Sequence, residues 1–159
     1  MKRSDINHII LEGISFFDEM KFKLPPFAYW STKEWESKNH EYDEIRENKL
    51  GWDITDFGSG DFYKKGLFLF TLRNGNPNRE KKTKSYAEKI MIVRENQVTP
   101  YHFHWNKTED IINRGGGNLM IKLFNSTGDG EFSRDPVQVH SDGRTYEVPA
   151  GTTLRLKPG

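Results

Sequence analysis

The sequence has no cysteine, which excludes disulfide bonds and thiolate metal ligands. It also has no apolar run near the roughly 20 residues that span a bilayer, and its first residues lack the apolar segment of a secretory signal peptide. Neither sign of charge dominates, because 24 basic residues face 23 acidic ones. We therefore expect a cytoplasmic protein with neither nucleic acid nor membrane as a partner.

Hydrophobic residues are few, at 34%, but aromatic residues reach 13% of the 159 positions. Each buried aromatic side chain removes a large area from water. A chain of this length and composition can therefore build one domain with a core of its own.

The first fifty residues have helical patterns. Apolar residues recur near the 3.6-residue period from Ile6 to Met20, and Ser4 is placed to cap that helix. Gly13 falls on the same apolar stripe and indicates close packing. Ser31 and Glu34 have the spacing of a capping box, which predicts a second short helix.

A third short helix is expected between about residues 41 and 48, so that residues 1–50 form an N-terminal helical segment. Beyond it, glycines separate short apolar segments. The expected strands are at residues 67–72, 87–94, 98–105, 109–113, 119–125, 137–140, 145–148 and 153–156. In the second of them, Ile90 and Ile92 are expected on one face and Lys89, Met91 and Val93 on the other. The polar, basic residues 76–84 predict an exposed loop. Such short, closely spaced strands indicate an antiparallel β-sandwich or barrel over residues 51–159.

A pair of histidines marks the centre of the β region. In an extended strand, His102 and His104 would present their imidazoles on one face, while Tyr101 and Phe103 face the other way. Glu109 follows five positions later. Two imidazoles and a carboxylate suit a divalent transition metal, so these three residues are the predicted metal ligands.

The spacing His-x-His-x4-Glu-x6-Gly, with Gly116 last, resembles the first motif of the cupin superfamily. The glycine that usually opens this motif is replaced by Asn96, and asparagine tolerates a left-handed turn. The resemblance implies a mainly β fold, the cupin double-stranded β-helix or jelly-roll barrel, with α-helices at the N-terminus.

Several further segments resemble the bacterial D-lyxose isomerase family, and the resemblance runs along the whole chain. They are residues 50–58, 87–89, 102–105, 109–117, 142–146 and 148–152. The resemblance implies an aldose–ketose isomerase whose divalent metal is held by His102, His104 and Glu109. Mn²⁺ is the favoured ion, with Zn²⁺, Co²⁺ or Fe²⁺ as alternatives. A small sugar is the expected partner, Lys89 the expected substrate-binding residue, and a homodimer the expected assembly.

Such an enzyme would interconvert D-lyxose and D-xylulose, or D-mannose and D-fructose. A proton then moves between C1 and C2 through an enediolate that the metal stabilises. The base that carries the proton is not assigned. Glu88 is a poor candidate, because it would face the side of its strand opposite to Lys89.

The chain departs from the family at its end, Lys157-Pro158-Gly159. The family continues for some tens of residues, which supply a second cupin motif, a fourth ligand histidine and the general base. Residues 143–154 match the opening of that motif, but Leu154 stands at the histidine position. We therefore expect an incomplete chain without isomerase activity of its own. His140 could replace the fourth ligand, although its place before a turn favours a surface histidine.

Two alternative functions stay open: a non-haem iron dioxygenase with the same ligands, and a non-catalytic sugar-binding cupin. Bound iron with oxygen uptake would mark the first, and absence of turnover the second. Trp52, Phe103 and Trp105 could form a sugar-stacking wall, but aromatic residues beside a β core are expected to be part of it. The extended resemblance favours the isomerase, since the cupin fold alone hosts many functions.

Overall fold

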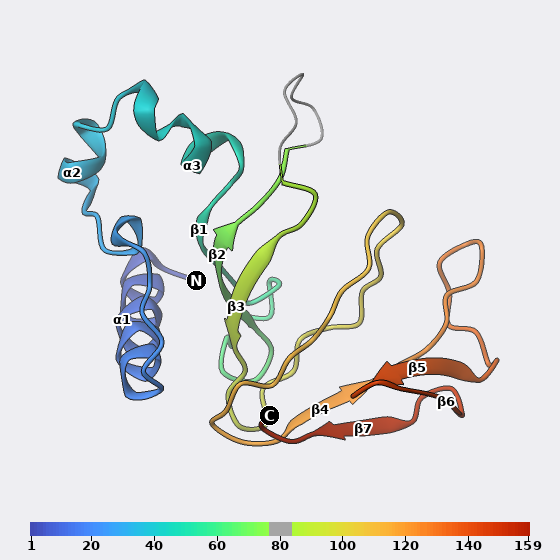
Figure 1. Ribbon diagram of the computed structural model, residues 1–159. Helices are drawn as coiled ribbons and strands as arrows, with labels where there is room; N and C mark the ends of the chain where they lie inside the picture. Colours follow the sequence, from blue (N-terminus) through green and yellow to red (C-terminus); the bar gives the residue numbers. More distant parts are fainter. Residues whose placement is uncertain (77–83) are drawn as a thin grey trace. The chain divides into compact units, whose positions relative to one another are not determined.

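The computed structural model describes residues 1–76 and 84–159 (Figure 1). Most of the predicted basic loop, residues 77–83, lies outside the described residues. The chain forms two compact units, Met1–Pro100 and Tyr101–Gly159. In the described part, every helix precedes Gly51 and every strand follows, so the chain is mainly β with N-terminal helices, as the sequence predicts. The division at residue 50 and the closed cupin barrel stay predictions.

The elements follow the chain in a simple order. The first unit contains α1 (Arg3–Glu19), η1 (Pro26–Ala28), α2 (Thr32–Glu36), η2 (His40–Tyr42), α3 (Asp43–Glu47), β1 (Gly51–Thr55), β2 (Leu67–Arg73) and β3 (Glu88–Ile92). The second unit contains β4 (Leu119–Lys122), β5 (Val137–Ser141), β6 (Arg144–Val148) and β7 (Thr153–Leu156). None of the helices in the described ranges has the length and apolar character needed to cross a membrane.

The helix starts show one wrong prediction and one confirmed prediction. Ser4 does not cap α1 but lies inside it, because Asp5 supplies the acceptor for the backbone N–H of Lys2 at 2.8 Å and the helix begins earlier. The capping box of α2 is confirmed. The amide of Glu34 donates to Oγ of Ser31 at 3.3 Å, and the amide of Ser31 donates back to Oε2 of Glu34 at 2.8 Å.

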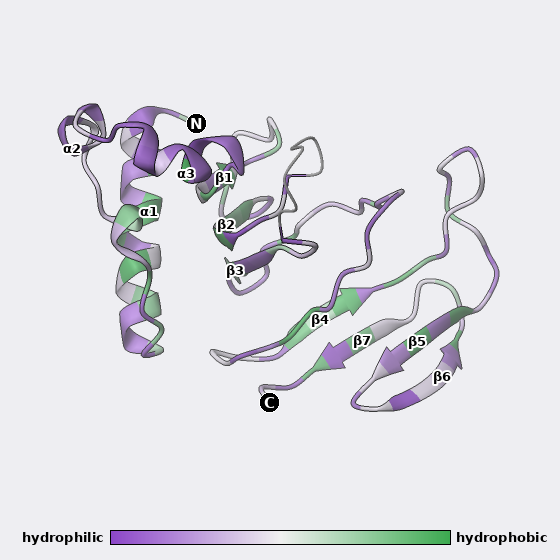
Figure 2. Cartoon of the chain, turned by 45° about the horizontal axis from the view of Figure 1, so that its top comes forward, coloured by the Kyte–Doolittle hydropathy of each residue, from purple (hydrophilic) through white to green (hydrophobic). Residues whose placement is uncertain are grey.

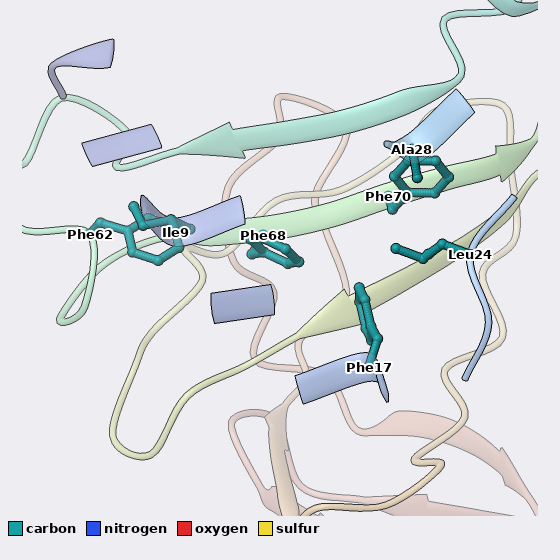
Figure 3. Packing of buried hydrophobic residues seen from close by; sticks show 7 residues of the cluster. All are labelled: Ile9, Phe17, Leu24, Ala28, Phe62, Phe68 and Phe70. Atoms are coloured by element: carbon teal, nitrogen blue, oxygen red, sulfur yellow. The ribbon is translucent and has the colours of Figure 1, made fainter. Parts of the chain in front are cut away.

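The core of the first unit lies between α1 and the three-stranded sheet. It is a cluster of seven buried apolar residues, Ile9, Phe17, Leu24, Ala28, Phe62, Phe68 and Phe70 (Figure 3). Phe68 and Phe70 come from β2 and meet the apolar stripe of α1, which the helical period predicts. The indole of Trp52 joins β1 to this core and donates a hydrogen bond to the carbonyl of Ala28 at 3.0 Å.

The sheet of the first unit is antiparallel, in the order β1-β2-β3. In β3, Ile90 and Ile92 are half-buried while Lys89 and Met91 are exposed, so the predicted alternation is confirmed. Phe70 pairs with Trp52 on one side and with Ile90 on the other. The central strand β2 contains four consecutive buried residues, whereas β1 and β3 contain none.

The second unit contains two antiparallel pairs, β4 with β7 and β5 with β6. Asp142 and Gly143 join β5 to β6 with positive φ at both positions, +50° and +74°, as a type I′ hairpin requires. Along β5, Val137 and Val139 are buried while Gln138 and His140 are exposed. Figure 2 shows the hydrophobic and hydrophilic residues of this strand in different colours.

The strands predicted at residues 98–105 and 109–113 are wrong. In the described residues no strand lies between Ile92 and Leu119, and Val98 makes only an isolated bridge with Lys65. A strand requires a partner that takes its backbone hydrogen bonds, and here no neighbouring strand pairs with these residues. The predicted metal ligands therefore lie on an irregular segment.

Candidate metal centre

The segment that holds the predicted ligands is flanked on both sides by side chains that hydrogen-bond to backbone groups. Before it, Asn96 has φ of +59°, which confirms the left-handed turn expected at the position of the cupin glycine. The buried side chain of Gln97 donates to the carbonyl of Phe62 at 2.6 Å and accepts from the amide of Arg94 at 3.1 Å. The chain therefore leaves the first unit from an anchored turn.

Asn113 anchors the other flank within the second unit. Its side-chain amide donates to the carbonyls of Gly117 and Leu156, both at 2.8 Å, and its Oδ1 accepts from the amide of Gly115 at 3.2 Å. The glycine turn that follows Glu109 is thereby tied to β7. It is a turn rather than a phosphate cradle, because no helix follows it in the part of the chain that the structure describes.

The structure brings the three predicted ligands together. The imidazole rings of His102 and His104 have centroids 5.1 Å apart. Nε2 of His104 lies 3.1 Å from Oε1 of Glu109. One nitrogen or oxygen from each of the three residues lies within 4.8 Å of the other two, and all three residues are exposed. The cluster forms although the segment is not the strand from which it was inferred.

The distance between His104 and Glu109 suits a shared divalent ion. With metal–ligand bonds of about 2.1 Å, neighbouring ligand atoms of an octahedral site lie about 3.0 Å apart. The 3.1 Å between His104 and Glu109 matches that spacing. Two imidazoles and one carboxylate also leave coordination positions for other groups. The types of the three residues therefore fit a divalent metal ion.

A lysine that the sequence analysis missed also contacts this cluster. Nζ of Lys107 lies 2.6 Å from Oε1 of Glu109, the same oxygen that approaches His104. Partial burial alone would raise the pKa of the Glu109 carboxyl. The hydrogen bond and charge of Lys107, helped by the two imidazoles, outweigh burial and hold that pKa below its usual range. Glu109 is therefore kept as a carboxylate, the form that binds a metal.

Aromatic residues alternate with the histidines. The ring of Tyr101 packs edge-on against Phe124 and Phe132, with centroids 5.6 and 5.1 Å away. The rings of Phe103 and Trp105 meet edge-on at 4.7 Å, but the residues are 43% and 71% exposed. The expectation that these two belong to the core is therefore wrong, whereas Trp52 does pack on the core.

The other candidates do not belong to this three-residue cluster. His140 is exposed on β5, and its Nδ1 is 2.9 Å from Oγ1 of Thr145, which confirms a surface histidine. Lys89 is exposed on β3 of the first unit. Glu88 pairs with Arg73 across the β2–β3 ladder. Lys107 and Asn113 were missed because their roles depend on contacts made by the folded segment. In the sequence, the one indication of a role for Lys107 is its position two residues before the predicted ligand Glu109.

Together the fold and the cluster define a mainly β protein with a histidine–histidine–carboxylate set of the kind that binds divalent metals. The sequence model of the D-lyxose isomerase family matches residues 1–159, and the chain belongs to this family. The predicted family, and with it the predicted enzyme class of sugar isomerases, is therefore confirmed.

Two relatives are similar along the whole chain. The D-lyxose/D-mannose isomerase of Serratia proteamaculans is 49% identical over 160 residues, and the D-lyxose/D-mannose isomerase of Escherichia coli O157:H7 is 48% identical over 160 residues. Each match covers 100% of this chain and 70% of the relative.

Proposed function

We propose that this chain supplies the metal-binding part of a metal-dependent aldose–ketose isomerase that interconverts D-lyxose and D-xylulose, with D-mannose and D-fructose as a second pair. The observation that carries the proposal is the cluster of His102, His104 and Glu109 in a chain of the D-lyxose isomerase family. The names of the two relatives support both sugar pairs.

His102, His104 and Glu109 would hold the ion. Mixed imidazole and carboxylate ligation favours Mn²⁺, and Zn²⁺, Co²⁺ or Fe²⁺ can use the same set. When bound, the metal acts as a Lewis acid that polarises the sugar oxygens on C1 and C2 and acidifies the hydrogen bonded to carbon. The task of the protein at these positions is to keep the two imidazoles and the carboxylate side by side, and their spacing supports that role.

Two further roles concern the sugar and its proton. Lys89 has an exposed ammonium on β3 that could donate to a sugar hydroxyl, so we assign it to substrate binding. Proton transfer between C1 and C2 also needs a base within hydrogen-bond reach. Glu88 does not suit that role, because its carboxylate already pairs with Arg73. The base, the homodimer and the cytoplasmic location stay predictions.

The ligand set predicts the effect of a single substitution. His104→Ala removes an imidazole nitrogen from the cluster, so the affinity for Mn²⁺ should fall by at least about tenfold. Free Mn²⁺ can be followed by electron paramagnetic resonance during a titration. His140→Ala is the matched control, since His140 is an exposed histidine of the same unit outside the cluster, and its affinity should stay unchanged. Equal losses in both variants would contradict the assignment.

Turnover should be measured on two proteins. One is this chain, and the other adds the residues of the Serratia proteamaculans relative that lie outside the match. Mn²⁺-dependent conversion of D-lyxose to D-xylulose, abolished by His104→Ala, would support the proposal. Bound iron with oxygen uptake would instead indicate a dioxygenase. Absence of both metal and turnover in the two proteins would indicate a sugar-binding protein.

A further inference from the structure

The side chain of Lys107 forms an ion pair with Glu109, one of the three candidate ligands. Its ammonium lies 2.6 Å from Oε1 of Glu109, and Nε2 of His104 lies 3.1 Å from the same oxygen. The side chains of Lys107 and Glu109 are 46% and 42% exposed, so water reaches both. The ammonium of Lys107 therefore contacts the same carboxylate oxygen of Glu109 that approaches His104.

This contact has a direct consequence for metal binding. A carboxylate oxygen has two lone pairs, and Oε1 already faces two nitrogen atoms. A divalent ion that binds Oε1 and His104 must take the space between those atoms. It would then meet the positive charge of Lys107 within a few ångströms unless the lysine side chain moves away.

We propose that Lys107 is a built-in counter-cation of the ligand set: its ammonium neutralises Glu109 when no metal is bound and competes with the incoming ion. This inference rests on the proposed function, since it requires that His102, His104 and Glu109 bind a metal. Lys107 is thus a residue that lowers metal affinity, and the flexible, exposed lysine chain lets it withdraw.

A second ion pair of the same chain allows a matched comparison. Nζ of Lys84 lies 2.6 Å from Oε1 of Glu44, in the first unit, and both partners are partly exposed. The distance equals that between Lys107 and Glu109, but Glu44 does not belong to the metal-binding cluster in the described residues. Removing Lys84 therefore removes an equivalent ion pair without touching the candidate ligands.

The test compares Mn²⁺ dissociation constants of the full chain and three variants by electron paramagnetic resonance. Lys107→Met should bind Mn²⁺ about two- to tenfold more tightly, because an exposed ion pair and a nearby like charge are removed. Lys107→Arg, which keeps the charge, and Lys84→Met should both stay within about twofold of the parent. Raising NaCl from about 0.05 M to about 0.5 M should shrink the advantage of Lys107→Met, because salt screens the lysine charge.

The outcomes distinguish the counter-cation role of Lys107 from the proposed metal-binding function of the cluster. If the parent binds Mn²⁺ and Lys107→Met binds it equally well or more weakly, the counter-cation role is wrong and the proposed function stands. Weaker binding would mean that Lys107 positions Glu109 for the metal. If the parent binds no Mn²⁺ and Lys107→Met binds none either, the proposed function and the counter-cation role both fail. Circular dichroism of each variant checks that the fold is retained.

Discussion

Gly13 of α1 lies against the ring of Phe68 on the central strand β2. A Cβ atom added there would lie 2.2 Å from Cζ of Phe68. Phe68 is only 3% exposed, and its ring is in contact with those of Phe17 and Trp52, with centroids at 6.0 and 5.4 Å. The ring therefore has little room to move aside, and the close packing that the sequence indicated is confirmed.

Two effects oppose each other when Gly13 is replaced by alanine. Alanine in a helix interior favours folding by about 1 kcal/mol over glycine, whereas overpacking a tight core costs about 1–3 kcal/mol. A separation of only 2.2 Å between the added Cβ and Cζ of Phe68 places the cost at the upper end. Gly13→Ala should therefore lower the free energy of unfolding by about 1–2 kcal/mol in urea titrations. Gly128→Ala, with no atom within 4 Å of the added Cβ, is the control, and a loss of the same size there would contradict the packing argument.

At the scale of an element, the turn that follows β1 depends on one ionised side chain. Asp56 is 8% exposed, and its carboxylate accepts hydrogen bonds from the amides of Gly58 at 3.1 Å and Gly60 at 3.2 Å. The Gly58 bond lowers the pKa of Asp56 most and burial opposes it, while the N-terminal ammonium of Met1, 3.7 Å away, and the Gly60 bond lower it further. The carboxyl is therefore more acidic in the folded chain than in the unfolded one.

The lowered pKa of Asp56 determines how the stability of the fold changes with pH. With a folded pKa below the unfolded pKa, Asp56 stabilises the fold above the unfolded pKa, and that stability is lost as pH falls through the folded pKa. The thermal midpoint should therefore drop between about pH 5 and about pH 3. Asp56→Asn should have a lower midpoint at neutral pH and a shallower drop. Asp53→Asn, at an exposed position of β1, serves as the control. A drop as steep in Asp56→Asn as in the parent would exclude this carboxyl as the cause.

The elements also show which parts of the structure local sequence signals can predict. The capping box of α2, the apolar stripe of α1 and the alternation in β3 depend on neighbours three, four or two positions away, and all three predictions are confirmed. The strands at residues 98–105 and 109–113 failed because pairing depends on a distant partner, which a local pattern does not specify. The ligand cluster was nevertheless predicted, because residue type and spacing carry the chemistry.

At the scale of the whole molecule, buried apolar residues are unevenly divided. In the described residues, those of the first unit are Ile9, Phe17, Leu24, Ala28, Phe62, Phe68, Leu69 and Phe70, while those of the second are Val137 and Val139. Local opening is easiest where few apolar contacts hold the chain. The irregular segment from residue 101 to residue 118, which contains all three ligands, should therefore be among the first to exchange its amide hydrogens.

Metal binding should slow amide hydrogen exchange in this segment alone. An ion held by His102, His104 and Glu109 ties together positions that span eight residues of a segment without helix or strand, so opening of that segment requires loss of the ion. At free Mn²⁺ about 100 times the dissociation constant, exchange there should slow by up to about a hundredfold. Hydrogen exchange read by mass spectrometry would show this at residues 101–118 and no change in β1 or β2. His104→Ala should show no slowing. Uniform slowing along the chain, or slowing that survives in His104→Ala, would mean that Mn²⁺ binds elsewhere and that the cluster is not the metal site.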